Sequence, residues 1–85
     1  MNIDTTGIQD TLKKLKRKDL TLFRALQNKI NQIARLSKAD IEHFKDLRGN
    51  LSRYKRVHVM SFVLMFKVEN DTIIFDRIRH HDDAY

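Results

Sequence analysis

The chain has 85 residues and a formal net charge of +6, from 17 lysines and arginines against 11 aspartates and glutamates. It contains no cysteine, which excludes a disulfide scaffold and a thiolate metal site. The longest apolar stretch, residues 57–66, is shorter than the ~18 residues that a membrane span needs. The N-terminus has no signal-peptide pattern. We therefore expect a single domain over residues 1–85, soluble and cytoplasmic, with one modest core.

The first half of the chain has helical periodicity. Apolar residues at intervals of four and three predict an amphipathic helix from Ile8 through Leu15. A longer pattern predicts a second helix over about residues 20–36, with Asp19 or Thr21 as its N-cap, so that the two helices form a hairpin. The pattern in residues 37–47 is weaker and predicts only a short apolar tether. The expected core residues of the second helix are Leu22, Phe23, Leu26, Ile30 and Ile33.

After Gly49 the apolar period changes to two. Alternation predicts one strand over residues 54–60 and another over 72–79, and the apolar run 62–68 between them predicts a central strand. Asn70 and Asp71 predict a two-residue hairpin turn, because both tolerate positive φ. Residues 1–6 could add a short edge strand. The sequence thus predicts an α+β fold in which the helical hairpin packs on a small antiparallel sheet.

The two faces of this sheet differ in chemistry. If the hairpin covers the face that carries Val57 and Val59, the alternate side chains of the first strand point to the open face. In the last strand, alternation places Ile73 and Phe75 opposite Ile74 and Ile78. Cations neutralise phosphates, tyrosine stacks on bases and imidazoles exchange protons near neutral pH. The candidate nucleic-acid residues are Arg53, Tyr54, Lys55, Arg56 and His58 on the first strand, Arg77 or Arg79 on the last, and His80 and His81 after it.

Each of these features also has a structural explanation. A basic edge strand prevents aggregation between sheets, and the lysines of residues 13–18 are typical of a solvated helix face. The net charge of +6 suits RNA, DNA, an acidic protein or a membrane surface. The run His80-His81-Asp82-Asp83 could chelate a metal, but adjacent strand residues point to opposite faces and no HExxH spacing is present. We therefore expect neither a metal nor another cofactor.

Five segments occur in a characteristic order: D-L-R-G at 46–49, Y-K-R-V-H-V at 54–59, F-V-L-M-F at 62–66, I-I-F at 73–75 and H-H-D-D-A-Y at 80–85. Together with the helical hairpin, they resemble the RelE/ParE superfamily of toxins from toxin–antitoxin pairs. The family's corresponding motifs are K-L-x-G, Y-R-x-R-V, Y-R-V-I-Y and H-R-x-x-V-Y. The resemblance covers roughly residues 8–85, and the histidines and tyrosine of the tail favour the RelE-like branch.

This resemblance implies a ribosome-dependent endoribonuclease that cuts mRNA without a metal, by attack of a 2′-hydroxyl on the adjacent phosphate. It assigns phosphate stabilisation to Arg56, acid–base chemistry to His58 with His81 or His80, and substrate orientation to Tyr85. The implied partners are an acidic antitoxin and mRNA on the ribosome, with no membrane and no small-molecule substrate. The implied catalytic residues are Arg56, His58, His81 and Tyr85, and the implied RNA-binding residues are Arg48, Arg53, Tyr54, Lys55, Arg77, Arg79 and His80.

Two positions depart from the family pattern. Val63 stands where many relatives have an arginine, which removes one phosphate-binding charge, and His81 replaces the arginine of the tail. Two alternatives therefore stay open. One is a ParE-like inhibitor of DNA gyrase, although that branch usually lacks the histidine and tyrosine of the tail. The other is a catalytically inactive member that binds only RNA or an antitoxin.

Overall fold

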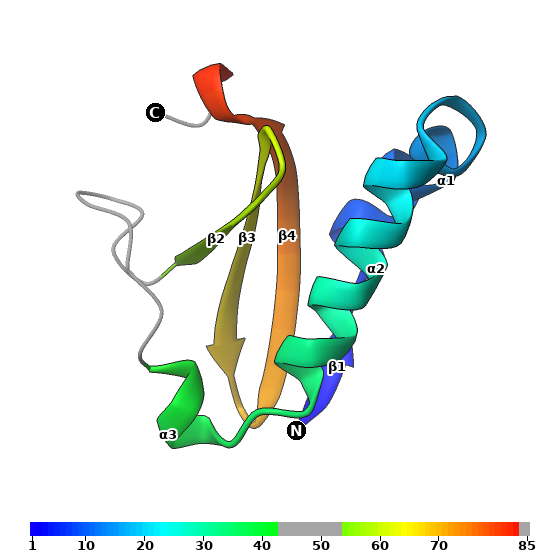
Figure 1. The fold of residues 1–85 in the computed structure, drawn as a ribbon. Coiled ribbons are helices and arrows are strands. Elements are labelled where there is room, and N and C mark those ends of the chain that lie inside the picture. The colour runs from blue at the N-terminus through cyan, green and yellow to red at the C-terminus, as the bar shows by residue number, and fades with distance from the viewer. Residues whose placement is uncertain (43–53, 84–85) are drawn as a thin grey trace.

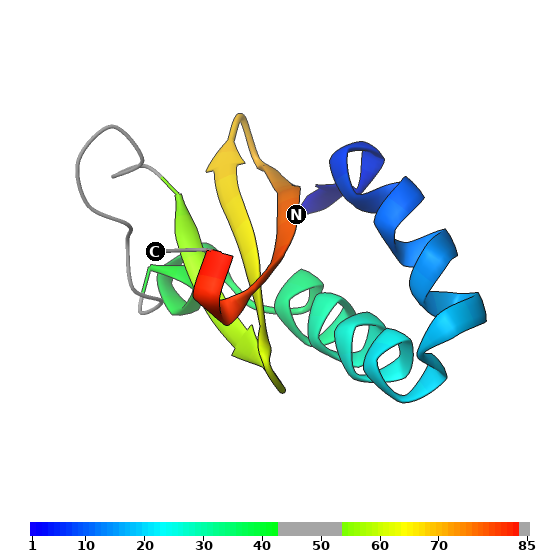
Figure 2. The same cartoon turned by 90° about the horizontal axis from the view of Figure 1, so that it is seen from above.

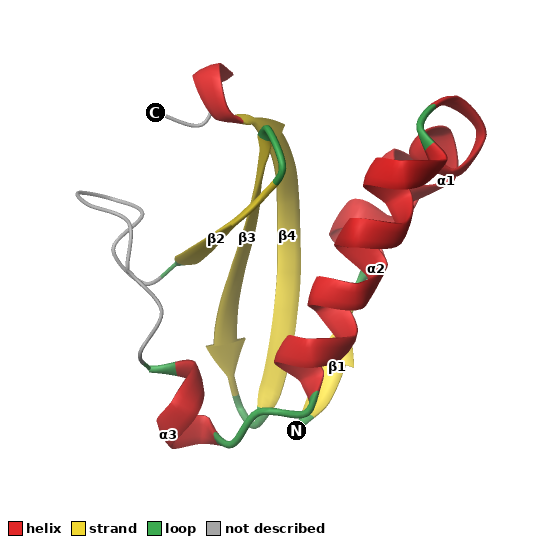
Figure 3. Cartoon of the chain, viewed as in Figure 1, coloured by secondary structure: helices red, strands yellow, loops and turns green. Residues whose placement is uncertain are grey.

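The computed structural model describes residues 1–42 and 54–83. Helices occupy most of residues 1–42, and the strands of a β-meander lie between Lys55 and His80 (Figures 1 and 3). The sheet order is β1-β4-β3-β2, with β1 parallel to β4 and the other pairs antiparallel, which confirms the α+β prediction and the N-terminal edge strand. The elements are β1 (Asn2–Asp4), a 3-10 turn (Thr6–Ile8), α1 (Gln9–Lys18), α2 (Leu20–Ala34), α3 (Lys38–Ile41), β2 (Lys55–Val59), β3 (Phe62–Glu69), β4 (Thr72–His80) and a final 3-10 turn (His81–Asp83).

The helical hairpin forms because Asp19 both ends α1 and begins α2. Its carboxylate accepts a hydrogen bond from the backbone N–H of Leu22 at 3.1 Å, which satisfies one of the free donors at the start of α2. The helix ends at Ala34, two residues before the predicted end. Figure 2 shows α1 and α2 lying together on one side of the sheet. The side chains that α2 buries are Leu22, Leu26, Ile30 and Ile33.

Phe23 was predicted to lie in the core but is only partly buried. Successive residues of a helix are rotated by about 100°, so Phe23 lies on the flank of the stripe that begins at Leu22. There the ammonium group of Lys16, on α1, lies 5.9 Å from the centre of the Phe23 ring. This aromatic side chain therefore contributes to the junction of the two helices.

A β-bulge in β4 decides which side chains face the helices. Phe66 of β3 pairs with Phe75, but the adjacent Met65 pairs with Arg77, so Asp76 is an extra residue without a partner in the ladder. The alternation along β4 shifts by one at this point, which brings Ile78 to the same face as Phe75. The sequence prediction that Ile78 lies opposite Phe75 is therefore wrong, because simple alternation cannot include an unpaired residue.

Gly7 fits against this bulge. A Cβ atom at Gly7 would lie only 2.9 Å from the carbonyl oxygen of Asp76 and 3.3 Å from that of Phe75. Such distances are shorter than van der Waals contact, so the 3-10 turn can approach the bulge only with glycine at this position. The N-terminal segment and the bulge are thus matched in shape.

Both hairpin turns use residues with positive φ. Asn70 and Asp71 have φ of 49° and 65°, which confirms the predicted turn between β3 and β4. Met60 has φ of 56° and belongs to the turn between β2 and β3, so β2 ends at Val59 rather than at Met60 as predicted. Among the described residues, no helix is both long enough and apolar enough to cross a bilayer.

Candidate active site

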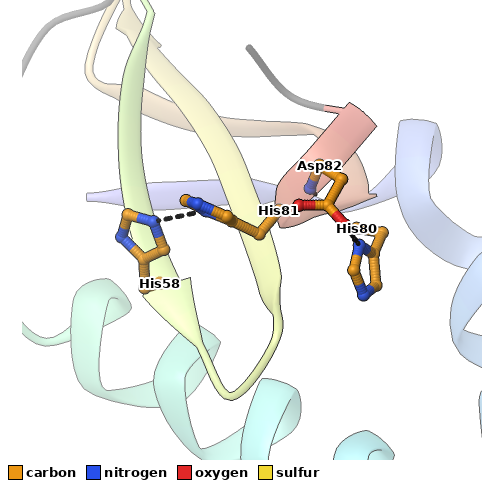
Figure 4. Close-up of polar contacts among 4 residues, drawn as sticks. All are labelled: His58, His80, His81 and Asp82. Atoms are coloured by element: carbon orange, nitrogen blue, oxygen red, sulfur yellow. Dashed lines mark hydrogen bonds and ion pairs between the residues drawn. The ribbon is translucent and has the colours of Figure 1, made fainter.

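Two histidines that are far apart in the sequence meet at one end of the open face. His58 lies on β2, and His81 begins the 3-10 turn that follows β4. Nε2 of His58 lies 3.2 Å from Nδ1 of His81, and the ring centres are 5.1 Å apart (Figure 4). Both side chains are exposed to solvent. The pairing of the strands brings these two imidazoles to one point.

A backbone hydrogen bond holds His81 in this position. The N–H of His81 donates to the carbonyl oxygen of Ser61 at 2.8 Å. Ser61 lies in the turn between β2 and β3, close in sequence to His58. The tail is therefore attached to the same hairpin that carries its histidine partner, which limits how far the two rings can separate.

The contact between the two imidazoles has a definite chemical meaning. A hydrogen bond between two ring nitrogens needs an N–H on one ring and a lone pair on the other. The pair thus holds a proton donor and a proton acceptor at one place. General acid–base catalysis requires these two groups, one that removes a proton and another that supplies one.

Arginines lie beside the histidine pair on the open face. In the strand pairing His58 aligns with Val63 and then with Arg79, and in the next row Arg56 aligns with Met65 and Arg77. The bulge at Asp76 is what places both Arg77 and Arg79 on this face. Neighbouring strands are about 5 Å apart, so the backbones of β2 and β4, which carry these arginines, flank β3 at a separation of about 10 Å.

An apolar floor lies between these two basic strands. Val63 is 0% exposed and Met65 is 5% exposed, and Tyr54 packs against the cluster that they form. Nζ of Lys67 lies 5.2 Å from the centre of the Tyr54 ring and 3.3 Å from a carboxylate oxygen of Glu69. The open face therefore offers cations at its sides, the ring of Tyr54 at one end and the proton-transferring imidazole pair at the other.

The chain matches the family model described as "ParE toxin of type II toxin-antitoxin system, parDE" over residues 4–85. A protein of Methanocaldococcus jannaschii, named as the toxin RelE4, is 39% identical over 82 residues, which span 93% of this chain and 83% of that protein. The chain belongs to the RelE/ParE family of toxins.

Solved structures agree with this assignment at the level of the fold. The toxin superimposes on a chain of the YoeB-YefM complex from Staphylococcus aureus with a TM-score of 0.70, at 17% identity and covering 95% of this chain and 97% of that one. It also superimposes on a chain of the E. coli DinJ-YafQ toxin-antitoxin complex with a TM-score of 0.60, at 20% identity and covering 99% and 96% of the two chains.

Two of the residues predicted for the toxin's site lie elsewhere. His80 pairs with Phe62, and its ring meets the Phe62 ring edge-on at 5.3 Å, on the side of the sheet opposite to His58. Nδ1 of His80 accepts a hydrogen bond from the backbone N–H of Asp82 at 3.3 Å. Figure 4 shows His80 pointing away from the pair that His58 and His81 form. His81 is therefore the tail histidine that joins the open face.

Lys55 also faces away from the arginines of the toxin. It pairs with Phe66, whose side chain lies in the helix-covered core, whereas the adjacent Arg56 lies on the open face. Lys55 lines a cavity of about 570 Å³ together with Lys38 and Ile41 of α3. This cavity is formed by α3 and the turn between β3 and β4, at the other end of the sheet from His81.

Three predicted residues, Arg48, Arg53 and Tyr85, lie outside the residues that the structure describes. The predictions missed two features of the candidate site. Lys67 could have been found, because a period of two from Val63 and Met65 reaches it on the open face. The contact of His81 with the Ser61 carbonyl has no signal in the sequence, because it depends on how the tail meets a distant turn.

Proposed function

We propose that this toxin is an endoribonuclease that cleaves mRNA on the ribosome. The observation that supports this most strongly is the contact between His58 and His81 beside the arginines of the open face. In the proposed reaction, a 2′-oxygen attacks the adjacent phosphorus and the bond from phosphorus to the 5′-oxygen breaks. The products are a 2′,3′-cyclic phosphate and a free 5′-hydroxyl.

The two imidazoles divide the proton transfers of this reaction. One removes the proton of the attacking 2′-hydroxyl, and the other donates a proton to the departing 5′-oxygen. These oxygens lie on opposite sides of the phosphorus during in-line attack, so the rings must separate to flank it. Both rings are exposed, which leaves them room to rotate. We propose that the pair rests in mutual contact and opens around the scissile phosphate.

The arginines stabilise the charge that develops on the phosphate. Arg56 lies one row from His58 along β2, and Arg79 lies in the row of His58 on β4. Each can donate two hydrogen bonds to phosphate oxygens. Arg77 already donates from Nε to Asp76 at 3.1 Å, which makes it a weaker candidate for this role. The loss of an arginine at Val63 is thus offset by cations on both neighbouring strands.

The tyrosines hold the substrate nucleotides. Tyr54 is held by its packing on the apolar cluster of the open face, so its ring provides a stacking surface for a base at little entropic cost. Tyr85 keeps the orienting role that the family resemblance implies. Stacking tolerates every base, so these contacts position the strand without requiring one sequence.

The proposed partners follow from the net charge and from the relatives. The charge of +6 favours polyanions. YoeB and YafQ were solved as the complexes YoeB-YefM and DinJ-YafQ, the second described as a toxin-antitoxin complex. We propose that an acidic antitoxin neutralises this toxin and that the ribosome, in the cytoplasm, presents its mRNA. The second candidate function is inhibition of DNA gyrase, which the ParE name of the matching family model favours.

Cleavage can be tested by inducing the toxin in cells and mapping mRNA 5′ ends. We expect new 5′-hydroxyl ends with the wild type. His58→Ala and His81→Ala should each lower cleavage by about 10²–10⁴-fold, since each removes one proton-transfer group. Tyr85→Phe tests the role of the terminal phenol. Lys14→Ala, on the exposed face of α1, is the matched control and should cleave normally.

Three outcomes would contradict this proposal in different ways. Growth inhibition that persists in both histidine variants would separate toxicity from the pair. A DNA-damage response without mRNA ends would favour the inhibition of gyrase. Binding of RNA or of the antitoxin with no cleavage by the wild-type toxin would identify a catalytically inactive member.

A further inference from the structure

The distance between the two imidazole nitrogens suits a second kind of ligand. Zinc binds imidazole nitrogens at about 2.0–2.1 Å, so two imidazoles in tetrahedral coordination have nitrogens about 3.3–3.4 Å apart. Nε2 of His58 and Nδ1 of His81 lie 3.2 Å apart without any metal. Both nitrogens can bind Zn²⁺ in the neutral imidazole. The pair is thus spaced as two ligands of one ion.

The surroundings of the two imidazoles allow each ring to exchange its contact with the other ring for a bond to a metal ion. Both rings are exposed, and a rotation of each would turn its nitrogen from the other ring towards a shared ion. The backbone hydrogen bond from His81 to Ser61, at 2.8 Å, keeps the two rings close while they rotate. The site is therefore partly preformed, which lowers the entropy lost on binding.

We propose that His58 and His81 form a two-imidazole site for Zn²⁺, and that the ion inhibits this toxin. Among the side chains that the structure describes, those of residues 1–42 and 54–82, no group of three metal ligands comes together, so in this proposal water completes the coordination of the ion. The cations of Arg56 and Arg79 lie nearby and weaken the binding of a divalent cation. The site is consequently an exchangeable one, weaker than a closed site with four protein ligands.

Inhibition follows from what the ion occupies. Zn²⁺ takes a lone pair from each ring, and the proton that the two nitrogens share passes, by exchange with solvent, to the other nitrogen of the ring that carried it, so that both rings stay neutral. Neither ring can then remove or supply a proton through that nitrogen. This consequence rests on the proposed ribonuclease function, whereas the binding of Zn²⁺ does not.

Binding can be measured on the purified toxin by titration with zinc chloride. Calorimetry gives the affinity and stoichiometry, and the imidazole signals in NMR spectra identify the ligands. We expect one ion per chain and shifts in the signals of His58 and His81. His58→Asn and His81→Asn should each weaken binding at least tenfold, and magnesium chloride should leave the signals unchanged.

His80→Asn is the matched control, because His80 is adjacent to His81 in sequence but lies on the other side of the sheet. It should bind Zn²⁺ as the wild type does. Two results would overturn the inference: imidazole signals unchanged at millimolar zinc, or binding that His80→Asn abolishes and His58→Asn retains. The second result would assign the ion to the tail sequence itself.

Cleavage of mRNA on ribosomes then separates this inference from the proposed function. Zinc at the concentration that saturates the NMR shifts should suppress cleavage at least tenfold, and a zinc-selective chelator should restore it. Full cleavage at saturating zinc would contradict inhibition. A toxin that binds Zn²⁺ through the pair but never cleaves mRNA would refute the ribonuclease function and leave the metal site standing.

Discussion

The same strands of the sheet present apolar side chains on one face and basic side chains on the other. On the helix-covered face, Phe66 and Phe75 are fully buried against α2. On the open face the same two strands present Arg77 and Arg79 beside the apolar floor of Val63. Stability is concentrated on one face and the proposed chemistry on the other. Substitutions on the helix-covered face should therefore lower the stability of the toxin, whereas substitutions on the open face should lower its activity.

The largest expected effect is on the helix-covered face. Phe75→Ala should destabilise the toxin by about 3–5 kcal/mol, because it leaves a cavity in the middle of the core. Urea unfolding followed by circular dichroism measures this loss. The comparison variant is Arg79→Ala, on the same strand but on the open face, which should stay within about 0.5 kcal/mol of the wild type while losing cleavage activity. A large loss of stability in Arg79→Ala would show that the open face also contributes to the stability of the fold.

A smaller effect is expected where the N-terminal turn meets the bulge. Gly7→Ala places a methyl group 2.9 Å from the Asp76 carbonyl oxygen, so the turn or the bulge must shift, at a cost of about 1–3 kcal/mol. Because the bulge brings Arg77 and Arg79 to the open face, cleavage should also decrease. Urea unfolding and the cleavage assay together measure both effects. Wild-type stability in Gly7→Ala would mean that this contact does not support the bulge.

The smallest effect concerns Asp4, on β1, which lies at the opposite edge of the sheet from the strand that carries His58. Hydrogen bonds from the backbone N–H and the side chain of Thr6 lower the pKa of the Asp4 carboxyl below its ordinary value of 3.8. A carboxyl with a lowered folded-state pKa stabilises the fold above its unfolded pKa, and this stabilisation is lost as pH falls through the folded value. Urea unfolding between about pH 5 and pH 2 should show this loss, and Asp4→Asn should remove that part of the slope. An identical slope in the variant would refute the assignment.

Local signals explain how much of the fold was predictable. Periods of 3.6 and 2 residues identified both long helices and all three strands of the meander, and Asn70 and Asp71 identified their turn. Asp19 and Thr21 were the two predicted N-caps, because a short polar side chain before an amphipathic stripe has a local role, and the structure shows Asp19 as the cap. The ends of the elements were predicted less accurately. Met60, for example, was predicted to end a strand but adopts positive φ in the following turn.

The site was predictable in composition but not in arrangement. His58, Arg56 and Tyr54 follow from the alternation of one strand, and they do lie on the open face. Lys55 and His80 were predicted with them but face the other side. Alternation separates Lys55 from Arg56, and this signal was present in the sequence. By contrast, the position of His80 depends on the bulge at Asp76, which reverses the alternation of everything after it.

By itself, the sequence determined the elements, the apolar face of each and the family, because these properties depend on residues close together along the chain. Only the tertiary structure decided that Asp76 is unpaired, that Arg77 and Arg79 share a face, and that His81 rather than His80 meets His58. These outcomes depend on contacts between distant segments: Gly7 against the bulge and the His81 N–H on the Ser61 carbonyl. Such contacts are decided by three-dimensional packing, which local periodicity does not encode.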